Sequence, residues 1–263
     1  MPILSLIEYL TLQKNNLKLY LTFNFYIFMS GHSKWTQIKR QKGITDHKRS
    51  AIFTKLGNVI SIASREGGED SESNFKLRLA IEKAKQANMP KENIERAIKR
   101  GAGKLEGSKI EEIIYEGFGP NGIPLIIEVL TDNKNRAAAN IKSILNKHNG
   151  SLSGPNSVLW KFKKCGVVKI NKSKITNLEE FELKLMDLQI EDIEEENEKL
   201  IIYTKLKEFQ KIKEKLEEQK IEIEYSEIEW INKEKIDFTA IKEKMEKILE
   251  ELNDEIDVNN VFY

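Results

Sequence analysis

Cationic, aromatic and imidazole side chains gather in one short stretch near the start of the chain. The stretch runs through Gly31-His32-Ser33-Lys34-Trp35, Lys39, Arg40, Lys42, His47, Lys48 and Arg49. Cations at this density bind phosphates by displacing condensed counterions, and an indole among them can stack on a base. These residue types therefore predict contact with nucleic acid. The alternative is a solvated basic tail that aids solubility, with Trp35 packed against the rest of the protein.

Two of these cations fall in the first turn of a helix that we expect to open near Thr45 or Asp46. A helix dipole disfavours cations at that end, so helix stability does not explain Lys48 and Arg49. Lys55 follows in the same helix. The candidate nucleic-acid-binding residues are His32, Lys34, Trp35, Lys39, Arg40, Lys42, Lys48, Arg49 and Lys55.

Charge is segregated along the chain, although the formal net charge is only +1. Residues 29–104 hold 17 Lys/Arg against 8 Asp/Glu, a net of +9, and residues 178–257 hold 13 Lys against 27 Asp/Glu, a net of −14. One end therefore attracts polyanions and the other repels them. The acidic part could bind a protein partner. Its run 191–196 could bind a cation, although a solvated face is the favoured interpretation.

Enzymatic and metal chemistry find little support in the sequence. The three histidines have no Cys or His at ligand spacing, and the single cysteine, Cys165, excludes a disulfide framework or a CxxC site. Gly101-Ala102-Gly103-Lys104 lacks the spacing and the hydroxyl of a phosphate loop, and it follows a helix, so it is expected to be a helix end and linker. We therefore predict no catalytic residue, no metal and no cofactor.

The first 28 residues are apolar and aromatic, unlike the rest of the chain. Their apolar run is shorter than the roughly 20 residues that span a bilayer, so we predict no membrane partner. They lack the cleavage site of a secretory signal and the Arg-rich composition of a transit peptide. The favoured expectation is an upstream start placed before a natural start at Met29, with a transit or anchor segment as the alternative.

The elements that must hold the candidate residues follow from apolar periodicity. A basic tail, residues 30–43, precedes three amphipathic helices that end at Gly67-Gly68, before Pro90 and at Gly101, and three such helices can form a bundle. Beyond residue 109 short strands and helices alternate, which indicates two α/β sandwiches. Strands are expected at 113–116, 123–130, 158–162, 166–170, 200–203, 221–225 and 258–263. Helices are expected at 133–148, from 177, at 206–219 and at 239–252.

Several stretches of the chain resemble one known family. Met29-Ser-Gly-His-Ser-Lys-Trp35, Ile52-Phe-Thr-Lys-Leu56, residues 88–98, Tyr115-Glu-Gly-Phe-Gly-Pro120 and Asp132-Asn-Lys-Asn-Arg136 are similar, in this order, to motifs of the YebC/PmpR family. The likeness is close from Met29 to about Val168 and loose beyond. Because family members begin at the position of Met29, it also favours Met29 as the natural start.

The resemblance implies a three-domain cytoplasmic protein of the α+β class. A three-helix bundle (29–105) would precede two ferredoxin-like α/β sandwiches. One of them (106–165 with 235–263) would be completed by the last helix and strand, and the other (166–234) would be inserted within it.

The resemblance also implies a DNA-binding transcriptional regulator. Relatives of the family include a mitochondrial translational activator, so a factor that binds the ribosome or its RNA is the second hypothesis. An adaptor acting through the acidic domains is the third. The basic segment does not distinguish DNA from RNA, since both are polyanions.

Overall fold

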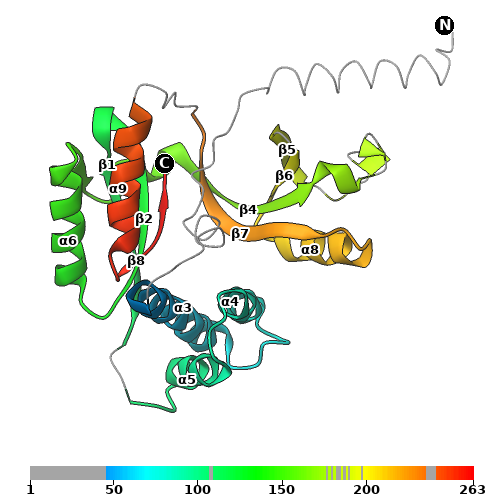
Figure 1. Ribbon diagram of the computed structural model, residues 1–263, viewed down its shortest axis with the longest axis horizontal. Coiled ribbons are helices and arrows are strands. Elements are labelled where there is room, and N and C mark those ends of the chain that lie inside the picture. Colours follow the sequence, from blue (N-terminus) through cyan, green and yellow to red (C-terminus); the bar gives the residue numbers. More distant parts are fainter. Residues whose placement is uncertain are drawn as a thin grey trace, which may run out of the picture.

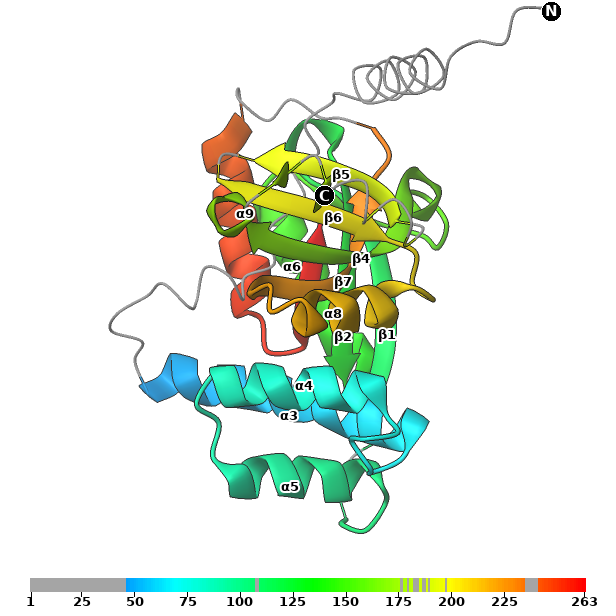
Figure 2. The ribbon, with the colours of Figure 1, turned by 90° about the vertical axis from the view of Figure 1, so that its right-hand side faces the viewer.

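The computed structural model describes residues 46–106, 109–175, 177–178, 180–181, 185, 188, 190–196, 198–234 and 241–263. Within them, three helices are followed by two four-stranded antiparallel sheets with their own helices, which confirms the expected α+β class. Figure 2 shows the three helices as a layer beneath both sheets. The expectations for the first 28 residues and for the basic tail lie outside the described residues.

The helical domain consists of α3 (Asp46–Gly67), α4 (Phe75–Gln86) and α5 (Lys91–Gly101). Its core gathers the apolar stripes of all three helices, among them Ile60 of α3 and Leu77 of α4, both fully buried. Helix α4 is capped by Asn74, whose side chain accepts from the backbone N–H of Leu77 at 3.1 Å. The bundle is thus built as the apolar period predicts.

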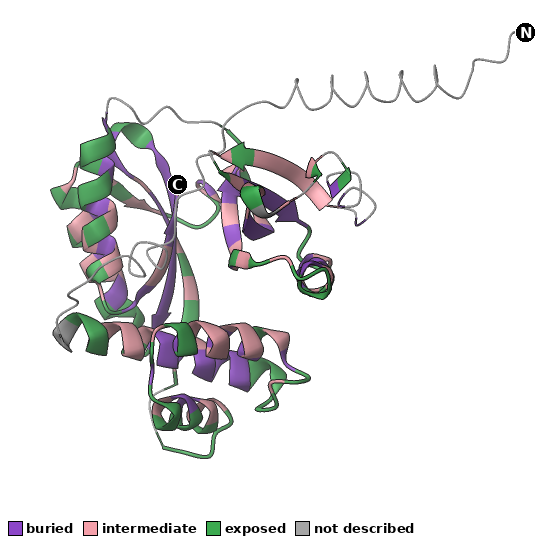
Figure 3. Ribbon diagram, turned by 45° about the vertical axis from the view of Figure 1, so that its right-hand side comes forward, coloured by how far each residue is buried: buried purple, intermediate pink, exposed green. Residues whose placement is uncertain are grey.

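The first sheet has the strand order β3-β1-β2-β8. Its strands are β1 (Glu111–Phe118), β2 (Pro124–Thr131), β3 (Ser151–Ser153) and β8 (Val258–Phe262). Helices α6 (Lys134–Lys147) and α9 (Lys242–Asp254) lie side by side on one face of it (Figure 1). Every residue of β2 is buried, because both faces of this strand are covered (Figure 3).

The second sheet has the strand order β5-β6-β4-β7, with α8 (Phe209–Glu218) on one face. Its strands are β4 (Phe162–Asn171), β5 (Ile190–Glu196), β6 (Lys199–Thr204) and β7 (Ile223–Asn232). In the chain this sheet falls between α6 and α9, while β8 pairs with β2 of the first sheet. One sandwich is therefore inserted in the other, as the resemblance implies.

Some predicted elements are wrong in detail. Residues 159–161 form a 3-10 helix and not the middle of a strand, and β3 was not expected. The acidic run 191–196 belongs to β5, where pairing with β6 outweighs the low strand preference of glutamate. Its carboxylates Glu191 and Glu195 lie 2.8 Å and 2.5 Å from lysine ammonium groups, so β5 is not simply a solvated acidic face.

The two sheets are joined through the second face of β2. Ile126 of β2 packs with Phe162 of β4 and Phe262 of β8 in one buried cluster. Beside them the Glu128 carboxylate accepts from Trp230 Nε1 and from Asn260 Nδ2, each at 3.0 Å. A buried carboxylate with two fixed donors thus holds β2, β7 and β8 in one arrangement.

The helical domain contacts both sheets. The Lys55 ammonium of α3 donates to the Asn253 carbonyl near the end of α9. Helix α4 packs on the second sandwich, where the rings of Phe75 and of Phe209 on α8 meet edge to face with centroids 5.9 Å apart. The Lys83–Glu227 ion pair, at 2.9 Å, joins α4 to β7. In the described part of the chain, no helix is both long enough and apolar enough to cross a membrane.

Candidate nucleic-acid interface

Three of the nine candidate residues lie on α3. Lys48 and Arg49 are exposed in its first turn, and Lys55 is half-buried about two turns further on. Since α3 begins at Asp46, the first two cations do sit at the helix end that disfavours them. The other six lie outside the described residues, namely His32, Lys34, Trp35, Lys39, Arg40 and Lys42.

Lys55 makes structural contacts. Its ammonium donates to the backbone carbonyls of Asn253, at 2.7 Å, and of Val258, at 2.6 Å. These carbonyls flank the turn between α9 and β8, so Lys55 ties the helical domain to the first sheet. A role for Lys55 in binding nucleic acid stays a prediction.

Helix α5 adds cations that the candidate set lacks. Arg96 and Lys99 are exposed and three residues apart, so they share one face of the helix. Neither forms an ion pair with any residue that the structure describes. The signal was present in the sequence, because Ala97 and its apolar neighbours point inward and leave positions 96 and 99 outward.

Arg100, the residue after Lys99, makes hydrogen bonds within the helical domain. Its guanidinium donates to Ser61 Oγ at 2.9 Å, Asn58 Oδ1 at 2.9 Å and the Gly57 carbonyl at 3.1 Å, all on α3. Burial lowers the pKa of this side chain. Arg100 therefore joins α5 to α3 and is not part of an exposed basic face.

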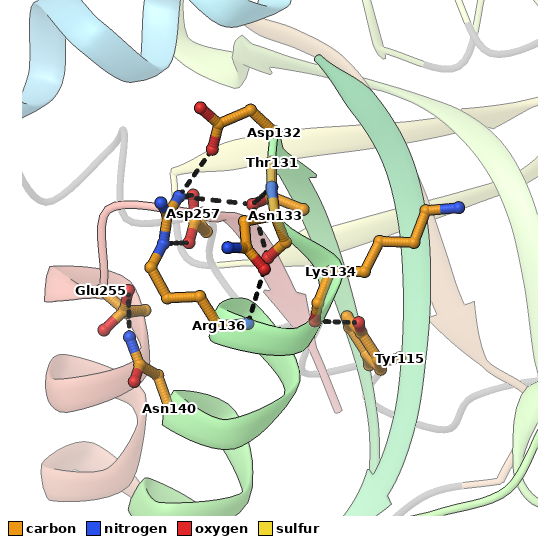
Figure 4. A network of polar contacts seen from close by, with 9 residues as sticks. All are labelled: Tyr115, Thr131, Asp132, Asn133, Lys134, Arg136, Asn140, Glu255 and Asp257. Carbon is orange, nitrogen blue, oxygen red and sulfur yellow. Dashed lines mark hydrogen bonds and ion pairs between the residues drawn. The ribbon is translucent and has the colours of Figure 1, made fainter. Parts of the chain in front are cut away.

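The motif 132–136, which carries part of the family resemblance, forms a polar network around Arg136 (Figure 4). The guanidinium donates to both carboxylate oxygens of Asp257, at 3.0 Å and 2.8 Å, and to Asp132 at 2.9 Å. The hydrogen bonds to Asp257, with its charge and that of Asp132, raise the pKa of Arg136 further above its usual range. The network fastens the segment before β8 to β2 and α6, since Asn133 also caps α6 through the backbone N–H of Arg136.

Cys165 is buried in β4, and its thiol donates to a Glu191 carboxylate oxygen at 3.3 Å. Burial and the carboxylate together raise the pKa of the thiol to about 12. A thiol so protonated is a poor nucleophile at neutral pH. Among the described residues, no three metal-binding side chains are grouped together.

The face of the second sheet opposite α8 holds a buried acid, Glu229. Its side chain accepts from the hydroxyl of Tyr225 on the same strand. Burial raises the pKa of Glu229 to about 7 and lowers the pKa of Lys169 on the neighbouring strand. Glu229 is 1% exposed, so a substrate in solution does not reach it in this conformation.

Two family models together match nearly all of the chain beyond its first 32 residues. Residues 33–104 match the family model described as the TACO1/YebC protein N-terminal domain. Residues 110–263 match the model described as the TACO1/YebC second and third domain. The match to the first model includes five of the six candidates outside the described residues.

Similar proteins from bacteria are described as probable transcriptional regulatory proteins. One from Syntrophomonas wolfei is 44% identical over 238 residues, which cover 89% of this chain and 95% of the relative. One from Thermotoga maritima is 45% identical over 233 residues, covering 89% and 91%.

Among solved structures, the crystal structure of a conserved hypothetical protein from Aquifex aeolicus resembles this fold. Its TM-score is 0.74 and its sequence identity 39%, over 87% of this chain and 95% of that one.

Proposed function

Because the chain belongs to the TACO1/YebC family, we propose that it is a non-enzymatic, cytoplasmic regulator of gene expression that works by binding DNA and regulating transcription. One observation carries the proposal. The helical domain exposes Lys48 and Arg49 where helix stability opposes them, directly after the basic tail.

Exposed cations without an ion pair support this choice of surface. On the helical domain, Lys48, Arg96 and Lys99 form no ion pair with described residues. Unneutralised cations release counterions when they meet phosphates, and this release drives binding of polyanions.

The proposed interface comprises the basic tail and the exposed start of α3. Its residues are His32, Lys34, Trp35, Lys39, Arg40, Lys42, Lys48 and Arg49, extended by Arg96 and Lys99 of α5, with Lys55 at its inner edge.

A second candidate is a translation factor that binds the ribosome or its RNA. It is favoured by the exposed indole of Trp160, which belongs to the 3-10 helix before β4 and has two lysines next to it. Sedimentation of the full-length protein in cell lysate separates the two candidates. Co-migration with ribosomes that vanishes at high salt supports translation, and a defined DNA footprint without co-migration supports transcription.

The polyanion surface itself is tested by the triple substitution Lys34→Ala, Lys39→Ala and Arg40→Ala. We expect weaker binding to duplex DNA and a salt dependence flatter by about 2 to 3 in the slope of log K against log salt, at about 0.9 per phosphate contact. The measurement is fluorescence anisotropy at several salt concentrations.

The matched control removes three exposed lysines elsewhere, Lys205→Ala, Lys207→Ala and Lys247→Ala. This control makes the same change in net charge and is expected to keep the wild-type slope. Equal slopes for the two triple variants would remove the basic tail from the interface.

A further inference from the structure

Trp160 exposes its indole at the junction of the two sheets. Its side chain lies in the 3-10 helix just before β4 and is 61% exposed, the highest value among the exposed large hydrophobic residues of the described chain. Leaving so large an apolar surface in water forfeits the free energy that its burial would supply. The fold itself therefore gives no reason for an indole at this position.

The turn that presents Trp160 is held rigidly. The Glu116 carboxylate of β1 accepts from the backbone N–H groups of Asn156, at 2.6 Å, and of Val158 and Leu159, each at 2.7 Å. Although burial acts to raise the pKa of Glu116, these backbone donors outweigh it and lower the pKa. The ionised carboxylate thus fixes the residues directly before Trp160.

The residues around the indole are fixed as well. Val158 is fully buried in the cluster that joins the two sheets. The indole Nε1 donates to the Ser157 carbonyl at 3.2 Å, and the Trp160 carbonyl accepts from Lys233 Nζ at 2.7 Å. An aromatic ring fixed in advance loses little conformational entropy on binding.

Two lysines contact Trp160, one at its ring and one at its carbonyl. Lys161 Nζ lies over the ring, 4.9 Å from the ring centroid, and the backbone N–H of Lys233 donates to the Lys161 carbonyl at 2.8 Å. One carboxylate, that of Glu234, pairs with Lys161 at 2.6 Å and is itself largely exposed. The group Lys161, Lys233 and Glu234 therefore keeps a net positive charge beside an exposed aromatic surface.

We propose that Trp160, Lys161 and Lys233 bind one unpaired nucleotide, with the base stacked on the indole and the adjoining phosphate held by the ammonium groups. The proposal rests on the proposed function, in that the protein binds nucleic acid, and it specifies a second contact that takes a single strand. A base inside a duplex has both faces covered by its neighbours, so only an unpaired base offers a face to the ring.

The surroundings of the ring favour a nucleotide over a protein partner. Hot spots in protein interfaces are aromatic anchors in well-packed pockets from which water is excluded. Here an ammonium group lies over the ring and a main-chain carbonyl accepts from its Nε1, while the nearby apolar residues Val158 and Phe162 are buried. A ring with cations beside it matches the stacking platforms of proteins that bind single strands.

The test measures binding of the full-length protein to a labelled 12-nucleotide single-stranded RNA and to a duplex DNA of the same length. Trp160→Ala is expected to weaken single-strand binding about 5- to 150-fold, because stacking contributes about 1–3 kcal/mol per base. Trp160→Phe should retain most of the affinity. Duplex binding should be unchanged in both variants.

Two further variants complete the design. Leu206→Ala removes another exposed apolar side chain and is expected to bind like the wild type. Lys161→Ala with Lys233→Ala should flatten the single-strand salt slope by about 0.7 per lost phosphate contact. Equal thermal midpoints for the wild type and Trp160→Ala show that the substitution leaves the fold intact.

The outcomes separate this inference from the proposed function. Wild-type affinity of Trp160→Ala for the single strand, with duplex binding present, would overturn the nucleotide site and leave the proposed function standing. A wild-type protein that binds neither oligonucleotide would overturn both. If Trp160→Ala binds both oligonucleotides normally but loses a defined protein partner, the ring belongs to a protein interface and the proposal is wrong.

Discussion

Glu229 is a buried acid whose ionisation falls near neutral pH. Its pKa is raised to about 7 chiefly by burial, and Lys169, Glu227 and Lys83 act on it through their charges. In the unfolded chain the same carboxyl has its ordinary pKa of 4.5. Between these two values the folded protein keeps a proton that the unfolded chain has released. Stability is therefore lost as the pH rises from about 4.5 to about 7.

Glu229→Gln should remove this pH dependence. At pH 8 we expect the variant to be more stable than the wild type by at most about 3 kcal/mol, at about 1.36 kcal/mol per pKa unit, because a neutral amide avoids the buried charge. Near pH 4.5 the difference should vanish. Urea unfolding at the two pH values measures it, with Glu250→Gln on the exposed face of α9 as the control. A stability difference that is the same at both pH values would contradict the assigned ionisation.

Residue type alone shows which side chains are cationic but not which of them are free to bind a ligand. Lys48 and Lys55 look alike in the sequence, yet Lys55 donates to carbonyls that lie 198 and 203 residues further along the chain. Such partners cannot be read from local spacing. Arg96 and Lys99 could have been predicted, since the apolar period of α5 fixes their direction.

At the scale of elements, helices α3 and α5 approach closely at Gly101. A Cβ atom there would lie 2.2 Å from the Ser61 carbonyl oxygen and 2.8 Å from Ser64 Cβ. The same two serines donate through their hydroxyls to carbonyls of α5, at 2.8 Å and 3.0 Å. The glycine and the two serines thus set the distance between the helices.

Two glycine substitutions in this pair of helices should have opposite effects. Gly101→Ala should destabilise the protein by about 1–3 kcal/mol, because the new methyl group has no space. Gly57→Ala in α3 should stabilise it by about 0.5–1 kcal/mol, since its Cβ would meet no atom closer than 3.8 Å and alanine favours the helix. Thermal midpoints of both variants measure the effects, and a Gly101→Ala chain more stable than the wild type would rule out the close approach.

The elements themselves could be predicted wherever a side-chain period was long and regular. All three helices of the helical domain and α6, α8 and α9 follow from apolar stripes, and the paired strands β1 and β2 from their apolar runs. The strand β5 could not be predicted in this way, because its acidic residues pair with lysines of other elements, Lys163 of β4 and Lys172 of the 3-10 helix that follows β4. The 3-10 turn at Leu159–Lys161 depends on the distant Glu116 carboxylate, which no local signal reveals.

At the scale of the whole molecule, the helical domain is fastened to the inserted sandwich through α4. The Phe75 ring packs on Phe209, and two ion pairs, Lys83–Glu227 and Lys213–Glu82, flank the contact at 2.9 Å and 2.8 Å. Lys213 is buried although charged, and a buried charge is tolerated when it is paired. We therefore expect the domains to be coupled in stability.

Phe75→Ala should loosen both sides of this contact. Hydrogen exchange is expected to rise in α4 and in α8 together, because the ring packs against the core of the inserted sandwich. The matched control is Phe53→Ala, which removes a ring that packs against the core of the helical domain. This control should raise exchange in α3 to α5 and leave α8 unchanged. Identical exchange maps for the two variants would show that α4 does not couple the domains.

The pairing of β8 with β2 also governs the order in which a growing chain can fold. A polypeptide is synthesised from its N-terminal end, so the helical domain and the whole inserted sandwich exist before β8 does. During that interval β2, all of whose residues are destined for burial, has one edge without its strand. An apolar strand with an open edge is a template for pairing with another chain. Until β8 is made, the nascent chain therefore offers this edge of β2 as a template for aggregation, and the pairing of β8 with β2 closes it.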